Sequence, residues 1–188
     1  MKSIALLEQV KTQTLQIKKT AEQFFLPLDA TAVNKKPSAT QWSIAECLEH
    51  LNYYSTYYNK EIKAAIQQAK SKNWKTQENF STTWLGRKSV EMVHPDNQKP
   101  IKTKKYLNPS FSKITPDVVQ RFIAGQEEFL ELIEAAQAID LNKAKVRIEV
   151  MKLFKLPLGD IFLFMVTHHQ RHCNQAMRAG GFNKAVAH

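Results

Sequence analysis

Three histidines stand within five residues near the end of the chain, in "MVTHHQRHCNQAM" (165–177), although the whole chain has only 6. His168 and His172 are four residues apart, which on a helix brings their Cβ atoms within about 6 Å of each other on one face. Two neutral imidazoles at this spacing can bind one divalent metal ion. A catalytic metal site usually has three protein ligands and an open position, so a third ligand is needed.

His50 is the candidate for the third ligand, because its depth in a helical bundle matches that of the other two. It lies about 10 Å from the start of a predicted helix that begins at Ser43, at 1.5 Å per residue. His172 and His168 lie about 10 and 16 Å before the end of the last predicted helix. If these two helices are antiparallel neighbours, the three imidazoles lie at nearly one level.

The histidines also have a purely structural interpretation. Histidines four residues apart occur in ordinary cores, bonded to each other or here to Tyr54 or Tyr57. A buried imidazole needs such a partner, because burial without one costs a few kcal/mol. Spacing alone leaves both interpretations open. We expect His169 to lie beside the site or on the surface, and His94 and His188 to be solvated.

The periodicity of apolar side chains predicts four long helices that would position these residues. They cover about residues 4–25, 43–69, 115–138 and 157–179. Thr115 is the expected cap of the third, with Pro116 at its first position, and Pro157 opens the fourth. Gly180-Gly181 ends that helix. A shorter helix is expected near residues 82–93, and residues 145–154 fit either an extended or a helical form.

The second helix has a specific start signal. Ser43 followed three residues later by Glu46 is a capping box, in which each side chain binds a backbone N–H that the helix leaves unpaired. Capping is the first interpretation of Glu46. In the second, it orients a metal ligand or pairs with Arg171. More than forty residues without sustained periodicity follow this helix, and such a connection lets two helices run parallel.

Composition predicts one domain over residues 1–188. A chain with 43% hydrophobic and 23% charged residues can bury a full core, and only 5 glycines with long periodic stretches favour an all-α fold. We therefore expect a four-helix bundle with a long crossover between helices two and three. The N-terminal apolar run breaks at Glu8, and the longest uncharged runs are too short to span a bilayer, so we expect a cytoplasmic protein without membrane contact. Cys47 and Cys173 are expected to be free thiols.

The net charge of +10 is unevenly distributed. Basic residues concentrate in 71–113 and 141–188, and acidic residues in 114–140. Such asymmetry attracts anions, including nucleic acid. We do not expect nucleic-acid binding, because no recognition helix or aromatic-basic repeat accompanies the charge. A solvated basic loop explains residues 98–114.

The stretches "WSIAECLEHL" (42–51) and "HHQRHCNQ" (168–175) together resemble the DinB-like superfamily of four-helix bundles, a group that includes metal-dependent hydrolase-like proteins. Both of its motifs, W-S-x-x-E-x-x-x-H-L and H-x-x-R-H-x-x-Q, are intact, and the resemblance covers nearly the whole chain. It implies that His50, His168 and His172 bind a divalent metal, usually zinc or nickel. It also implies a homodimer. Characterised members include bacillithiol S-transferases and a mycothiol-dependent maleylpyruvate isomerase, which implies a small-molecule substrate and a low-molecular-weight thiol.

Two functions are therefore expected. The first is a metal-dependent thiol S-transferase or hydrolase that uses the open coordination position. The alternative is a non-catalytic stress-response or binding module in which the metal is structural, for which a fourth ligand such as Cys47 would be needed. Residues expected around the pocket are Glu46, Tyr54, Tyr57, Arg171 and Gln175, with Arg171 holding a substrate anion or forming an ion pair. No catalytic residue is identified.

Overall fold

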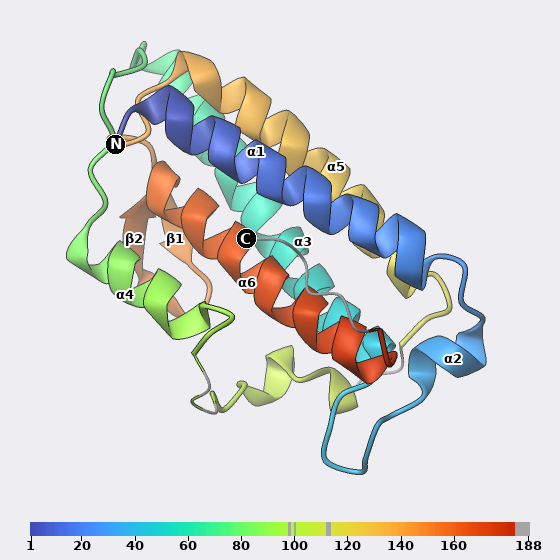
Figure 1. Ribbon diagram of the computed structural model, residues 1–188. Coiled ribbons are helices and arrows are strands. Elements are labelled where there is room, and N and C mark those ends of the chain that lie inside the picture. The colour runs from blue at the N-terminus through green and yellow to red at the C-terminus, as the bar shows by residue number, and fades with distance from the viewer. Residues whose placement is uncertain (98, 100, 112–113, 183–188) are drawn as a thin grey trace.

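Four long helices lie side by side in the protein (Figure 1). The computed structural model describes residues 1–97, 99, 101–111 and 114–182. The long helices are α1 (Ser3–Thr20), α3 (Ile44–Ser71), α5 (Val118–Ala135) and α6 (Leu158–Ala179). A π-helical turn, Ala21–Phe25, extends α1, and a 3-10 turn, Ala136–Ala138, extends α5. The fold is mostly helical, as the apolar periodicity predicts.

Smaller elements pack around the long helices. They are α2 (Ala30–Asn34), α4 (Trp84–Val93), two 3-10 turns (Lys105–Leu107 and Pro109–Phe111), and the antiparallel strands β1 (Lys145–Ile148) and β2 (Met151–Pro157). The hairpin departs from the expected all-α class. In β1, buried Val146 and Ile148 alternate with exposed Lys145 and Arg147, which is the two-residue period of a strand.

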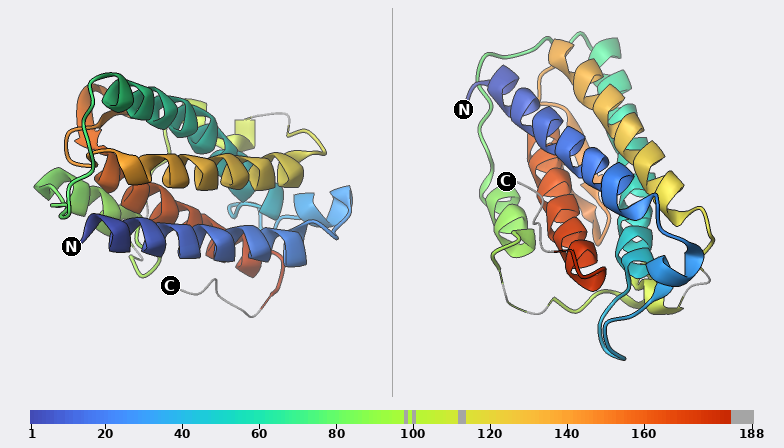
Figure 2. Two further views of the ribbon diagram at one scale, coloured as in Figure 1. Left: turned by 90° about the horizontal axis from the view of Figure 1, so that it is seen from above. Right: turned by 45° about the vertical axis from the view of Figure 1, so that its right-hand side comes forward.

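α3 and α5 run in the same direction, as the long crossover between them predicts. Asn52 on α3 donates to the carbonyl oxygen of Val118 on α5 (3.2 Å). Seven residues further along both helices, Asn59 donates to the carbonyl oxygen of Gly125 (3.1 Å). Only parallel helices keep this offset constant. The connecting segment carries α4 along the outer side of α6 before it returns to α5 (Figure 2).

α3 and α6 are antiparallel neighbours, which is the arrangement that a three-histidine site requires. The rings of His50 and His168 lie 5.2 Å apart between centroids. Tyr54, four residues later on α3, faces Phe164, four residues earlier on α6, at 6.3 Å. Moving forward along α3 therefore means moving backward along α6. The depth match predicted between His50 and the histidines of α6 is therefore met.

The predicted capping box opens α3. Ser43 Oγ accepts from the backbone N–H of Glu46 (3.1 Å), and the Glu46 carboxylate accepts from the backbone N–H of Ser43 (2.9 Å). The second carboxylate oxygen of Glu46 accepts from Lys36 Nζ (3.0 Å) and Ser110 Oγ (2.8 Å). Glu46 therefore joins the start of α3 to the loops on either side of it.

We expect Ser43→Ala to lower the free energy of unfolding by about 1 kcal/mol, because the backbone N–H of Glu46 loses its acceptor at a buried helix start. Urea denaturation followed by circular dichroism measures the loss. Ser38→Ala, at an exposed position in the preceding loop, should change stability by less than about 0.5 kcal/mol. Equal stabilities of the two variants would show that the cap contributes nothing.

Two predicted helix boundaries are wrong by one or two residues. α5 begins at Val118, not at Pro116, and Thr115 does not cap it. The Thr115 hydroxyl instead donates to the carboxylate of Asp117, which also accepts from Arg121 one turn along. Pro157 is the last residue of β2, so α6 begins one residue later. The stop after α6 is as predicted, with Gly181 at a left-handed φ of 74°.

None of the described helices is long and apolar enough to cross a membrane. Both cysteines are free and buried, as expected.

Candidate metal centre

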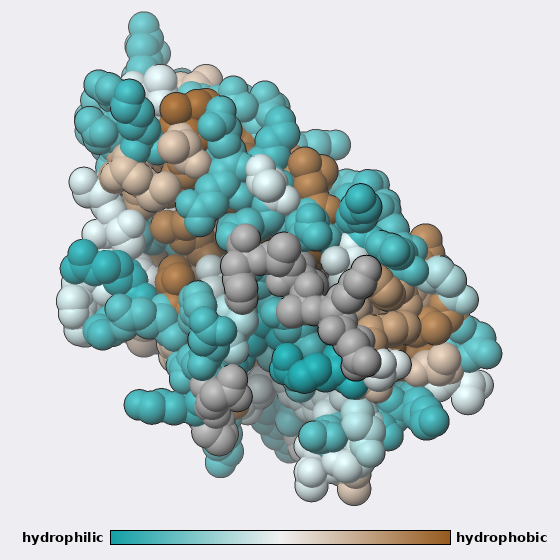
Figure 3. Space-filling model, viewed as in Figure 1, coloured by the Kyte–Doolittle hydropathy of each residue, from teal (hydrophilic) through white to brown (hydrophobic). Residues whose placement is uncertain are grey.

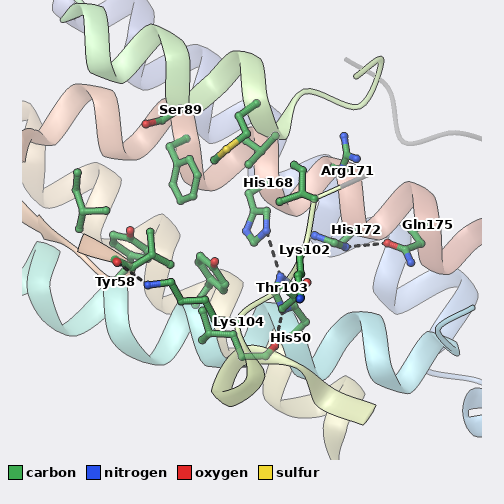
Figure 4. Close-up of a pocket in the computed structure, with 18 of the residues that line it drawn as sticks. His50, Tyr58, Ser89, Lys102, Thr103, Lys104, His168, Arg171, His172 and Gln175 are labelled. Carbon is green, nitrogen blue, oxygen red and sulfur yellow. Dashed lines mark hydrogen bonds between the residues drawn. The ribbon is translucent and has the colours of Figure 1, made fainter. Parts of the chain in front are cut away.

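His50 from α3 and His168 and His172 from α6 converge in the interior (Figure 4). These residues are called the three-histidine group below. One ring nitrogen from each lies within 4.8 Å of the other two. The Nε2 atoms of His50 and His168 are 3.3 Å apart. The structure thus brings together the three histidines that the sequence singles out.

Two of the imidazoles are fixed in the tautomer that a metal ligand needs. His50 Nδ1 lies 2.8 Å from the carbonyl oxygen of Leu107, and His172 Nδ1 lies 2.9 Å from the amide oxygen Oε1 of Gln175. Both oxygens only accept, so each Nδ1 carries the hydrogen and donates it. Each Nε2 therefore presents its lone pair to the centre of the group, and the acceptor behind it sets the ring orientation.

The spacing of one pair of donor atoms fits a tetrahedral ion. Zinc binds imidazole nitrogen at about 2.0–2.1 Å, so two such nitrogens around one tetrahedral ion lie about 3.3 Å apart. The Nε2 atoms of His50 and His168 have this separation. His50 Nε2 presents a lone pair here, so at this distance either the Nε2–H of His168 donates to it or a cation lies between the two nitrogens. A divalent metal ion between them would accept a lone pair from each.

Burial keeps the three-histidine group neutral at pH 7. His50 is 3% exposed and His168 4%, while His172 is partly buried. Burial lowers the pKa of His50 to about 4, although the bond to Leu107 opposes the shift. Burial, together with the neighbouring histidines, holds the pKa values of His168 and His172 well below the ordinary value of 6.5. Neutral imidazole is the form that binds metal, so no proton has to leave first.

The three-histidine group opens into a cavity of about 630 Å³, called the cavity below, which lies between α3, α4, α6 and the hairpin. Three aromatic side chains of the cavity wall pack against the imidazoles. Trp42 stacks on His172 at 5.7 Å between centroids, Tyr54 lies 4.4 Å from His168, and Phe164 stacks on His168 at 5.5 Å. Tyr54 was expected in this place.

Two of these aromatic residues were missed from the sequence. Phe164 precedes His168 by four residues, so helical spacing alone could have placed it beside that ring. Trp42 stands in the motif that carries His50, but it was not among the residues expected at the site. Its ring lies 5.2 Å from that of His50 and also contacts His172. The role of Leu107 could not be predicted from its residue type, because it acts through its backbone carbonyl oxygen.

Of the other expected pocket residues, Gln175 and Arg171 line the cavity, and Glu46 and Tyr57 do not. Glu46 serves as the cap and does not pair with Arg171. Arg171 lines the cavity, but its Nη1 donates to the carbonyl oxygens of His94 (2.8 Å) and Asn97 (2.7 Å). Tyr57 packs edge-on against Tyr58 and does not line the cavity. Cys47 is fully buried and outside the three-histidine group.

His169 is buried and not on the surface, which was one of its two expected places. It is 0% exposed. Its Nδ1 lies 3.1 Å from Gln126 Oε1 and its Nε2 3.5 Å from Ser55 Oγ, and its ring contacts Phe122 and Phe129. His169 follows His168 on α6 and therefore points in a different direction, into the packed interface with α5 and not into solvent. The side chain of His94 is 45% exposed, as expected, and His188 lies outside the described residues.

We expect Gln175→Ala to weaken zinc affinity by about 10- to 100-fold, the usual effect of removing the outer partner of a metal-bound histidine. Without the acceptor, the ring of His172 loses both its orientation and its fixed tautomer. Competition titration with a chromophoric chelator measures the change. Gln175→Glu keeps an acceptor and should retain the affinity, and Gln67→Ala, on the exposed face of α3, controls for nonspecific effects. An unchanged affinity in Gln175→Ala would remove this residue from the site.

Comparison with known proteins agrees with the geometry. The family model of the DinB superfamily matches residues 13–176. A search of curated proteins and a search of solved structures gave no match. The family match spans most of the chain and includes the whole three-histidine group, which on its geometry could hold a divalent metal. The protein belongs to the DinB superfamily.

Proposed function

We propose that the protein is a metal-dependent enzyme that transfers a low-molecular-weight thiol to a small electrophile or hydrolyses a small substrate. The observation that carries the proposal is the convergence of three neutral imidazoles, from two antiparallel helices, at the wall of a cavity. The volume of about 630 Å³ is in the range of ligand pockets. The three-histidine group would hold the ion, zinc or nickel, since imidazole suits both.

The chain's own residues bind and orient the reacting molecules. A divalent cation held by three imidazoles lowers the pKa of a coordinated thiol or water and so supplies a nucleophile at neutral pH. Leu107 and Gln175 keep two of the imidazoles in position through their acceptor oxygens. Trp42, Tyr54 and Phe164 shield the imidazoles from bulk water, which strengthens the electrostatic interactions within the site.

The catalytic proposal is favoured over a purely structural metal by the number of ligands. Structural zinc sites normally have four protein ligands. Among the described residues, no cysteine or carboxylate joins the three-histidine group. Burial raises the pKa of the Cys47 thiol, which opposes its use as a thiolate ligand. Metal removal separates the two functions, because loss of a structural metal should sharply lower thermal stability and loss of a catalytic metal should not.

Turnover of a generic electrophile tests the proposal. Metal-loaded protein is incubated with a panel of low-molecular-weight thiols and monochlorobimane, whose fluorescence rises when a thiol replaces its chloride. We expect catalysis above the uncatalysed rate with at least one thiol, and loss of that catalysis in His172→Ala. His94→Ala should retain it, because this side chain lies outside the three-histidine group. Equal rates for His172→Ala and the unaltered protein would overturn the proposal.

The homodimer that the family resemblance implies is part of the same proposal. Light scattering coupled to size-exclusion chromatography should give twice the mass of one chain. A monomer at all concentrations would contradict it.

A further inference from the structure

Positive charge surrounds the cavity. Beyond the three-histidine group, its lining includes Lys102, Lys104 and Arg171. Among the described residues, no aspartate or glutamate lines it. In Figure 4, Arg171 extends from α6 on one side of the imidazoles and Lys104 lies on the other. A bound divalent ion would add two more positive charges to the same space.

Two of these three cations are held in place by backbone carbonyl oxygens, which do not neutralise their charges. Lys104 Nζ donates to the carbonyl oxygen of Val150 (2.8 Å), which joins the loop before α5 to the hairpin. Arg171 uses one nitrogen, Nη1, for both of the hydrogen bonds that it forms within the described residues, so there its other N–H groups are left for a ligand. Within the described part of the chain, none of the three forms an ion pair with a carboxylate. Their charges therefore act on whatever enters the cavity.

The remaining wall is mainly apolar. Its buried part consists of Leu156, Ile161 and Phe164, beside the half-buried Tyr54. Met92, Ile101 and Met151 also line the cavity, and each remains 42–45% exposed, so the entrance is apolar as well. The hydrophobic surface in Figure 3 is broken up by hydrophilic residues on the visible face, whereas the cavity gathers apolar and cationic side chains in one place. Such a lining suits a ligand with an apolar body and a negative group.

We propose that the substrate of this site is an amphipathic anion, a small molecule with an apolar body and a carboxylate or similar acidic group held by Lys102, Lys104 and Arg171. This inference names the substrate class of the proposed reaction and rests on that reaction for its biological meaning. The binding preference itself depends only on the cavity. Lys102 is the residue to test, because it is exposed, and its replacement leaves the bonds of Lys104 and Arg171 intact.

A matched pair of fluorescent probes measures the preference. 1-Anilinonaphthalene-8-sulfonate carries an apolar body and one sulfonate, and N-phenyl-1-naphthylamine has the same rings without the charge. We expect metal-free protein at low ionic strength to bind the anionic probe at least about 10-fold more tightly than the neutral one, since several unscreened charges act together. Lys102→Glu should weaken binding of the anionic probe by about 10-fold and leave the neutral probe unchanged. Lys63→Glu makes the same charge change on an exposed part of α3 and should alter neither.

Two outcomes would overturn the inference. Equal affinities for the two probes would show that the cavity is only apolar. Retention of anionic-probe binding in Lys102→Glu, with its loss in Leu153→Ser, would place the probe on the hairpin surface, where Leu153 is 98% exposed. His172→Ala separates this inference from the proposed reaction. The variant should lose turnover and still prefer the anionic probe. If the unaltered protein turns over electrophiles without any preference for anionic ones, the proposed reaction stands and the proposed substrate class is wrong.

Discussion

Zinc affinity should fall by at least about 1,000-fold in His50→Ala, more than the 10- to 100-fold expected when only an outer partner is lost. His50 is the single member of the three-histidine group that α3 supplies. Without it, the two remaining imidazoles lie on one helix, and the ion loses the ligand that closes the site from the other side. Competition with a chromophoric chelator gives the affinity, and circular dichroism establishes that the variant is folded.

His94→Ala provides the matched control for that loss. It removes an imidazole that is 45% exposed and keeps the backbone carbonyl to which Arg171 donates. Its zinc affinity should equal that of the unaltered protein. If both variants keep full affinity, the metal binds elsewhere, and if both lose it, the effect is not specific to the three-histidine group.

The metal-free protein should lose stability steeply in mild acid, and His169 should account for a measurable part of this. Burial, together with His50, lowers the pKa of His169 to about 3, whereas the unfolded chain has the ordinary value of 6.5. Below pH 6.5 the unfolded chain therefore binds a proton that the folded protein does not. The stability that neutral His169 contributes is complete above pH 6.5 and is lost progressively as the pH falls toward 3. Between pH 7 and pH 5 the loss is about 2 kcal/mol for one such histidine.

His169→Gln tests this contribution, because the amide of glutamine can still donate to Gln126 Oε1 but does not titrate. In the presence of a chelator, urea denaturation at pH 7 and pH 5 should show that this variant loses about 2 kcal/mol less than the unaltered protein. His94→Gln makes the same substitution at a side chain that is 45% exposed and serves as the matched control. A parallel pH dependence of His169→Gln and the unaltered protein would mean that His169 is already charged in the folded state.

The sequence predicted the candidate site because each step depends on a regular element. The four-residue spacing of His168 and His172 places both on one helix face, and the capping box at Ser43 fixes where α3 begins. Depth along two antiparallel helices then brings His50 to the same level. Helix rise and start signals are local properties, so they can be derived without knowing the tertiary structure.

What the sequence left open depends on contacts between distant segments. The carbonyl of Leu107 acts through its backbone, and its bond to His50 joins residues that are far apart in the chain. Arg171 was expected to hold a substrate anion or to form an ion pair, and the sequence did not show that the loop after α4 supplies two carbonyl oxygens that occupy one of its nitrogens. The sequence did not place His169 in the interface between α5 and α6, because the width of the buried face of α6 depends on how closely α5 packs against it.

X-ray absorption at the metal edge of the zinc-loaded protein tests the central claim most directly. The three-histidine group predicts one ion per chain with three imidazole nitrogens at about 2.0–2.1 Å, and one further light ligand at the open position. His50→Ala should lose this signature. A spectrum dominated by sulfur at about 2.3 Å, or one without imidazole scattering, would contradict the assignment of these three histidines as the metal site.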